Sequence, residues 1–312
     1  MEEKGLDVVI APAGQADCRL IARLMLERRI DEPHFQRMAR SRLQRMLYER
    51  WAAPRFLSRD ADTFRATTGG ELAGFLVLLY EHPAVVIVDM AALEPFKGQF
   101  LERHLLAHAA QVTAQREYPY LRAALTAGDA YVAERFQEAG FQPLEFRRWE
   151  FNGTVRAQEI PPGITMQPLA GRALLDRRRH YSRMELDAAQ PAGRELIEAH
   201  YLPRRPPLSQ AFEVLHEGEP FGYLAARRER GTYILNLSTL PEWWASDLEV
   251  ALVTAFPVLA ARAEQANVRL IPDTTPHADA LARALTALGL HRRLSEPDIW
   301  FKALGGEGPQ RG

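Results

Sequence analysis

The chain has 312 residues, of which 47% are hydrophobic and 25% charged, and this balance excludes a disordered protein. Lysine and arginine number 39 and aspartate and glutamate 40, so no overall charge favours nucleic acid or a membrane surface as a partner. A single cysteine, Cys18, excludes an intramolecular disulfide and a cysteine-rich metal site.

The sequence begins with MEEKGLDVVIA, which lacks the basic start and the long apolar run of a secretory signal. No stretch approaches the roughly 18 apolar residues of a membrane span. We therefore expect a cytoplasmic protein that does not bind a membrane.

The first half alternates strand-like and helix-like segments. Gly69 and Gly70 supply the positive φ angles of a tight hairpin turn. Leu101, Leu105 and Ala109 form one apolar stripe of a helix. The patterns predict strands at 6–11, 84–93, 120–126 and 143–151, a hairpin at 63–80, and helices at 17–29, 33–48, 97–117 and 129–139.

The second half repeats this plan after a Pro- and Gly-containing segment without periodicity. The patterns predict strands at 164–169, 232–240, 267–272 and 299–304, a hairpin at 212–228, and helices at 171–181, 192–201, 246–265 and 278–288. We therefore expect domains at 1–152 and 164–304, a linker at 153–163 and a flexible tail at 305–312.

Two pairs of segments indicate that the halves are copies of one module. GELAGFLVL, which starts at Gly70, resembles GEPFGYLAA, which starts at Gly218. RFQEAGF and ALTALGL, which contain Gly140 and Gly289, follow in the same order and at nearly the same spacing. Such a long period is typical of duplicated domains, because solenoid repeats run about 20 to 50 residues.

This order of elements resembles the GNAT acetyltransferase superfamily, and the resemblance covers the whole chain, one copy in each half, as in tandem GNAT enzymes. It implies an α/β (α+β) fold of two GNAT-like acyl-CoA N-acyltransferase modules, each with a mixed, mostly antiparallel sheet flanked by helices. It also implies acetyl-CoA as the co-substrate and an amine as the acceptor. We expect a small-molecule or peptide amine, no nucleic acid and no metal.

In that family, a glycine-containing loop after the central strand holds the acetyl-CoA pyrophosphate at a helix N-terminus. The matching segments are KGQFLE, which starts at Lys97, and WASDLE, which starts at Trp244 and carries Asp247 and Glu249 at glycine positions. Carboxylates there would repel a pyrophosphate, so the second site is expected to be lost. The resemblance assigns cofactor contacts to Ala92, Leu93, Lys97, Gly98, Gln99, Phe100 and Asp129. The segment at Lys97 is equally typical of a solvated helix start.

Asp89 in the central strand is the candidate catalytic residue, as a general base that deprotonates the amine. The alternative for Asp89 is a strand-end carboxylate that faces solvent or pairs with an arginine. The tyrosine that commonly serves as the general acid in the family is replaced by Phe136 in the first half and Leu285 in the second, and neither donates a proton.

Two functions remain open at this point. The first is an N-acetyltransferase with its activity in the first half. The second is a catalytically inactive tandem GNAT fold that serves as a binding or scaffolding module. Trp243 and Trp244 would form a binding surface, fill the vacated cofactor cleft or pack between the halves. An aminoacyl transferase of the FemABX type is a weaker third, because the neutral charge balance does not favour a nucleic-acid partner.

Overall fold

The computed structural model divides into two compact units, Met1–Pro143 with Ile299–Gly312, and Leu144–Asp298. Each unit contains one seven-stranded sheet. The structure describes residues 7–29, 41–94, 96–97, 101–125, 130–144, 149–156, 162–201, 210–244, 246–270, 278–294 and 298–304.

In the sheet of the first unit, the first four strands and the last two pair antiparallel, and the fourth and fifth strands pair in parallel. In spatial order its strands are β1 (Val8–Pro12), β2 (Asp62–Thr68), β3 (Glu71–Glu81), β4 (Ala84–Ala92), β5 (Tyr120–Leu125), β14 (Asp298–Ala303) and β6 (Gln142–Pro143). Gly69 and Gly70 have φ angles of 60° and 85°, which confirms the turn between β2 and β3.

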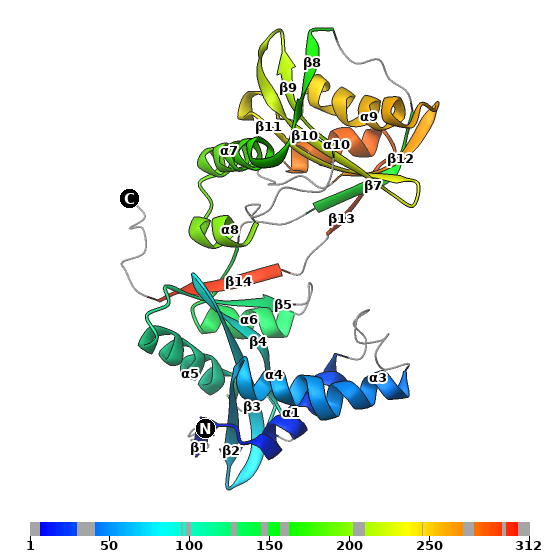
Figure 1. Ribbon diagram of the computed structural model, residues 1–312. Coiled ribbons are helices and arrows are strands. Elements are labelled where there is room, and N and C mark those ends of the chain that lie inside the picture. Colours follow the sequence, from blue (N-terminus) through cyan, green and yellow to red (C-terminus); the bar gives the residue numbers. More distant parts are fainter. Residues whose placement is uncertain are drawn as a thin grey trace, which may run out of the picture. The chain divides into compact units, whose positions relative to one another are not determined.

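Helices cover both faces of this sheet (Figure 1). On one face, α5 (Leu101–Gln115) and α6 (Ala130–Glu138) pack on a core that contains Leu76, Ile87 and Phe136. On the other face, α1 (Gln15–Arg28) and α4 (Ala53–Arg59) pack on Phe75 and Val77. The described part of this unit also contains α3 (Arg42–Leu47) and the π-helix η1 (Tyr48–Ala52).

The second unit repeats this strand order. Its strands are, in the corresponding spatial order, β8 (Ile164–Leu169), β9 (Gln210–His216), β10 (Glu219–Glu229), β11 (Thr232–Thr239), β12 (Gln265–Leu270), β7 (Trp149–Arg156) and β13 (His291–Leu294). Its helical segments are α7 (Gly171–Ala189), α8 (Arg194–Tyr201), η2 (Pro241–Trp243), α9 (Asp247–Ala261) and α10 (Ala278–Ala287). The tail at 305–312 lies outside the described residues.

The repeated glycine of the two matching segments has a packing reason. A Cβ atom on Gly74 would lie 2.5 Å from the carbonyl oxygen of Ala91, and one on Gly222 would lie 2.5 Å from that of Ser238. Both glycines therefore let the third strand of a sheet approach the fourth closely.

One strand of each sheet comes from the other half of the sequence, which differs from the contiguous modules that we expect above. β14 takes its place between β5 and β6 in the first unit, and β7 pairs with β12 and β13 in the second. Residues 153–156, which the sequence places in a linker, form the second half of β7, where Val155 pairs with Ala266. A duplicated module offers an equivalent place in either copy, so a strand pattern does not reveal which copy the strand joins.

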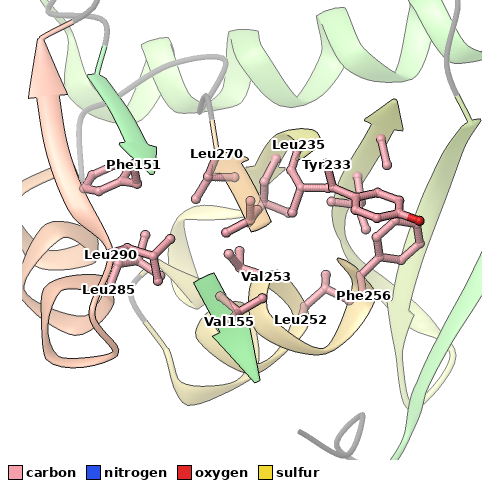
Figure 2. Close-up of a cluster of buried hydrophobic side chains, with 14 of the residues drawn as sticks. Phe151, Val155, Tyr233, Leu235, Leu252, Val253, Phe256, Leu270, Leu285 and Leu290 are labelled. Atoms are coloured by element: carbon pink, nitrogen blue, oxygen red, sulfur yellow. The ribbon is translucent and has the colours of Figure 1, made fainter. Parts of the chain in front are cut away.

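The exchanged strands supply core residues to the units that they join. In the second unit, Phe151 and Val155 of β7 are buried against Leu252, Leu285 and Leu290 (Figure 2). In the first unit, Trp300 of β14 belongs to the core on the α5 face. In each unit, one hydrophobic core therefore includes side chains from the other half of the chain.

Candidate functional site

A gap in the sheet of the first unit forms between β4 and β5. The two strands pair in parallel only from Ala84 with Tyr120 to Ile87 with Ala123. Beyond Ile87, β4 continues to Ala92 and β5 continues to Leu125, but the two strands do not pair with each other in these stretches. Backbone groups at the carboxyl ends of these strands are thus left for other partners.

A β-bulge at Val88 begins this unpaired stretch. Asp89 is opposite Val77 and Ile87 is opposite Leu78, so Val88 is the extra residue. Ile87 packs on the α5 face of the sheet, whereas Val88 packs on the α1 face. The bulge shifts the alternation by one residue, so that Asp89 also reaches the α1 face, where it meets Arg28.

A cavity of about 610 Å³ opens at the gap. It is lined by residues 87–92 of β4, by 123–125 of β5, and by side chains of both helical layers. Arg28 and Arg29 contribute from the end of α1, and Tyr131, Arg135 and Phe136 contribute from α6. The cavity therefore joins the two faces of the sheet through the space between β4 and β5.

The two expected backbone donors at the end of β4 differ in direction. The N–H of Leu93 donates to the carbonyl oxygen of Ala73 at 2.7 Å, so it is already used by β3. Ala92 is opposite Gly74, and in an antiparallel ladder alternate residues direct their N–H groups away from the partner strand. The N–H of Ala92 therefore points toward the gap.

Asp89 forms an ion pair with Arg28, in line with the second interpretation of this residue. Arg28 Nη1 donates to Asp89 Oδ1 at 3.0 Å and to the carbonyl oxygen of Met90 at 3.0 Å. The N–H of Met90 donates to the same Oδ1 atom at 2.8 Å. These bonds hold the carboxylate beside the unpaired stretch of β4.

The expected phosphate loop is described only in part. Lys97 is exposed and lines the cavity, and Glu102 lines it from the first turn of α5. The N–H of Phe96 donates to the carbonyl oxygen of Leu93 at 2.7 Å, which tightens the chain after β4. Gly98, Gln99, Phe100 and Asp129 lie outside the described residues, so their assignments stay predictions.

Tyr131 is a lining residue that the sequence reasoning missed. Phe136, at the place of the family's general acid, is only 2% exposed and packs edge-to-face on Phe141. Tyr131 lies one and a half turns earlier on α6, lines the cavity and is 39% exposed. The guanidinium of Arg135 lies 5.3 Å from its ring centroid. The tyrosine itself was the available signal, on the same predicted helix.

The second unit closes the corresponding helix N-terminus with its own side chains. Ser246 caps α9 and accepts a hydrogen bond from the N–H of Glu249 at 3.2 Å. Glu249 is 1% exposed and accepts a hydrogen bond from Thr239 Oγ1 at 2.8 Å. A cap and two acidic side chains, Asp247 and Glu249, thus occupy the place where a phosphate would need donors and positive charge.

The two tryptophans beside this helix pack inward. The Trp243 ring lies 5.3 Å from that of Phe221 and 5.0 Å from that of His216, and Trp244 Nε1 donates to the carbonyl oxygen of Thr239 at 3.2 Å. β11 also shows no bulge opposite β10 in the described register, unlike β4.

The described part of the chain contains no group of three or more His, Cys, Asp or Glu side chains placed to hold a metal ion. Among the helices of the described ranges, none has the length and apolar character required to cross a membrane.

No protein-family model and no curated protein matches the chain. Among solved structures, it is similar to a GCN5-related N-acetyltransferase from Sphaerobacter thermophilus, at 15% identity and a TM-score of 0.49, over 96% of each chain. It is also similar to a tandem GNAT protein from the clavulanic acid biosynthesis pathway, at 16% identity and a TM-score of 0.42, over 97% of this chain and 100% of that one. A probable N-acyltransferase from Enterococcus faecalis matches at 11% identity and a TM-score of 0.45, over 95% and 73%.

These similarities are distant, and the fold class follows from the chain's own topology. Both units have a mixed sheet of one strand order, in which the fourth and fifth strands are parallel and a long helix follows the fourth. The sequence predicts two modules of the mixed α/β class, each with a mostly antiparallel sheet flanked by helices, and the topology confirms this class of fold.

Proposed function

We propose that this protein is a GNAT-type N-acetyltransferase that transfers an acetyl group from acetyl-CoA to an amine at the gap of the first unit. The observation that carries this proposal is the cavity of about 610 Å³ at the point where β4 and β5 part. It brings a backbone N–H, a carboxylate, a phenol and cationic side chains to one place. The acceptor is a small-molecule or peptide amine, and the protein works in the cytoplasm.

The pyrophosphate of acetyl-CoA would be held between β4 and α5, by the exposed ammonium of Lys97 and by backbone N–H groups of Gly98, Gln99 and Phe100 ahead of α5. Asp129 would contribute at the start of α6. Anions are stabilised at a helix N-terminus by its unpaired donors and dipole. Acetyl-CoA supplies an activated thioester whose carbonyl carbon accepts the amine.

Three groups of this chain would assist the transfer. The N–H of Ala92 points toward the gap and would donate to the thioester carbonyl oxygen, on which negative charge develops. Asp89 would take the amine proton, directly or through water, as the N–C bond forms. Tyr131 would give a proton to the departing sulfur as the C–S bond breaks.

Calorimetric titration with acetyl-CoA tests this proposal. We expect one site per chain with a dissociation constant of about 1 to 100 μM, because the start of α9 is capped by Ser246 and carries two acidic side chains. Lys97→Glu and Gly98→Glu are expected to abolish binding, since both place negative charge next to the pyrophosphate. Asp247→Lys is the matched control in the second unit and is expected to leave the stoichiometry at one.

A catalytically inactive binding or scaffolding role is the second candidate, and the closed N-terminus of α9 favours it for the second unit. Absence of acetyl-CoA binding at about 1 mM ligand would favour that role for the whole chain. Two sites per chain would contradict the assignment of activity to the first unit.

A further inference from the structure

The α1 side of the cavity carries a specific pattern of charge. Arg28 and Arg29 lie at the end of α1, and both line the cavity. The Arg28 side chain is 46% exposed, whereas the side chain of its partner Asp89 is only 10% exposed. A ligand that enters from this side therefore meets the guanidinium before it meets the carboxylate.

The guanidinium of Arg28 is fixed by two hydrogen bonds and carries further N–H donors. Its Nη1 makes the two hydrogen bonds to Asp89 and Met90, and its guanidinium lies 5.9 Å from the centroid of the Phe75 ring. Among the described residues, no hydrogen bond of Arg28 Nε or Nη2 accompanies these two. A fixed guanidinium with further N–H groups is the geometry that binds planar oxyanions in a bidentate manner.

Tyr48 connects Arg29 to the same cluster. Burial raises the pKa of Tyr48, the Arg29 guanidinium opposes this increase, and the Asp89 carboxylate adds to it. Two guanidinium groups and one largely buried carboxylate therefore line this side of the cavity.

We infer that the acceptor of the first unit is an amine that carries an oxyanion, a carboxylate or a phosphate, which Arg28 and Arg29 hold on the α1 side of the gap. This inference rests on the proposed acetyltransferase function. On the α5 and α6 side, Lys97 and Arg135 line the cavity and would face the phosphates of acetyl-CoA, although Arg135 Nη1 also donates to Glu138 Oε2 at 2.6 Å. The two substrates would then approach the gap from opposite faces of the sheet, each guided by its own pair of cationic side chains.

The same charges serve the chemistry of the amine. Only the neutral amine attacks a thioester, and nearby positive charge disfavours the ammonium form. The two guanidinium groups would therefore lower the pKa of the bound amine while they hold its oxyanion. This reduces the demand on Asp89, whose carboxylate is already engaged by Arg28.

Matched acceptor pairs test this inference with the full-length protein. Thiol release from acetyl-CoA is measured with glycine against glycinamide, and with 2-aminoethyl phosphate against ethanolamine, so that each pair differs in the oxyanion. We expect kcat/KM to be about tenfold or more higher for the charged member of at least one pair. The pair with the larger ratio distinguishes a carboxylate from a phosphate.

Two substitutions assign the preference to the arginines. Arg28→Lys keeps a positive charge next to Asp89 but removes the planar guanidinium with its several N–H donors. Arg29→Gln removes a positive charge without breaking the ion pair between Arg28 and Asp89. Both are expected to reduce the ratio within the preferred pair about fivefold or more, with unchanged acetyl-CoA affinity in calorimetry. Arg23, exposed on the same helix, provides the control variants Arg23→Lys and Arg23→Gln, which should keep the ratio.

The outcomes separate this inference from the proposed function. Equal kcat/KM values within both pairs would overturn the inference and leave acetyl-CoA binding in place. The same conclusion follows if the protein binds acetyl-CoA but releases no thiol with any of the four amines. A preference that both arginine variants retain would overturn the assignment to Arg28 and Arg29. Failure to bind acetyl-CoA would overturn the proposed function and the inference together.

Discussion

The exchange of β7 and β14 predicts that each unit is destabilised by a substitution in the other half of the sequence. Phe301 of β14 is 2% exposed, and its ring lies 6.2 Å from that of Tyr120 in the first unit. Phe151 of β7 is 0% exposed in the core of the second unit. We therefore expect Phe301→Ala to loosen the first unit and Phe151→Ala to loosen the second.

The magnitude follows from burial. Truncation of a fully buried phenylalanine costs about 3 to 5 kcal/mol, because transfer free energy is lost and a cavity remains. Each 1.4 kcal/mol is about a factor of ten in an opening equilibrium, so the affected unit should open roughly two to four orders of magnitude more often. Amide hydrogens of its central strands should exchange faster by a similar factor.

Hydrogen exchange read by peptide mass spectrometry measures each unit separately. In Phe301→Ala, peptides from 71–92 should exchange faster and peptides from 219–239 should not, and Phe151→Ala should show the reverse. Arg172→Ala serves as the control, since the Arg172 side chain is 93% exposed. Acceleration of 219–239 by Phe301→Ala, with 71–92 unchanged, would refute the exchange and restore contiguous modules.

Three further predictions concern single positions. Gly74→Ala should lower the free energy of unfolding by about 1 to 3 kcal/mol in thermal melts, because its Cβ would lie 2.5 Å from the carbonyl oxygen of Ala91. Thr239→Val should cost about 1 to 3 kcal/mol in denaturant unfolding, because it removes a hydrogen bond to the buried carboxylate of Glu249. Burial and then the Glu213 carboxylate raise the pKa of Tyr181 from 10.0 to about 12, so the folded state binds this proton more tightly than the unfolded state does. The resulting stabilisation is complete below pH 10.0 and should fall by about 1.4 kcal/mol per pH unit as the pH rises toward 12, a slope that Tyr181→Phe removes.

Each of these predictions has a matched comparison. Gly14→Ala places its Cβ at 3.5 Å from Asp17 Oδ2, an ordinary contact, and at the N-cap of α1 it should lower the melting temperature less than Gly74→Ala does. Thr232→Val, at the start of the same strand as Thr239, should cost less than Thr239→Val. An identical loss of stability between pH 10 and 12 in the wild type and Tyr181→Phe would show that another group is responsible.

The elements themselves could be predicted from local patterns. The turn at Gly69 and Gly70 requires positive φ angles, and a run such as AVVIVDMAA favours a buried strand in any context. The acidic residues around Ser246 predicted the loss of the second phosphate cradle from charge alone. The buried contacts of Glu249 and the cap by Ser246 support that prediction.

The geometry of the site was harder to predict from the sequence, because it depends on a β-bulge and on the register between two strands. Simple alternation from Ile87 would direct Asp89 to the α5 face, and a single extra residue, Val88, directs it to Arg28 instead. The use of the Leu93 N–H by Ala73 likewise depends on the register of β3 against β4. Neither the bulge nor the register can be predicted from the composition of the strands or from the spacing of their residues.

The sequence by itself therefore determined the class of fold, its duplication and the sign of the charges at the two helix starts, since these depend on local propensity and on residue type. Only the tertiary structure decided which copy receives each closing strand and which face of the sheet Asp89 occupies. Two equivalent places in a duplicated fold differ in energy only through packing between distant segments, and a one-residue bulge is decided by strand register. Both are long-range properties that no local window of residues contains.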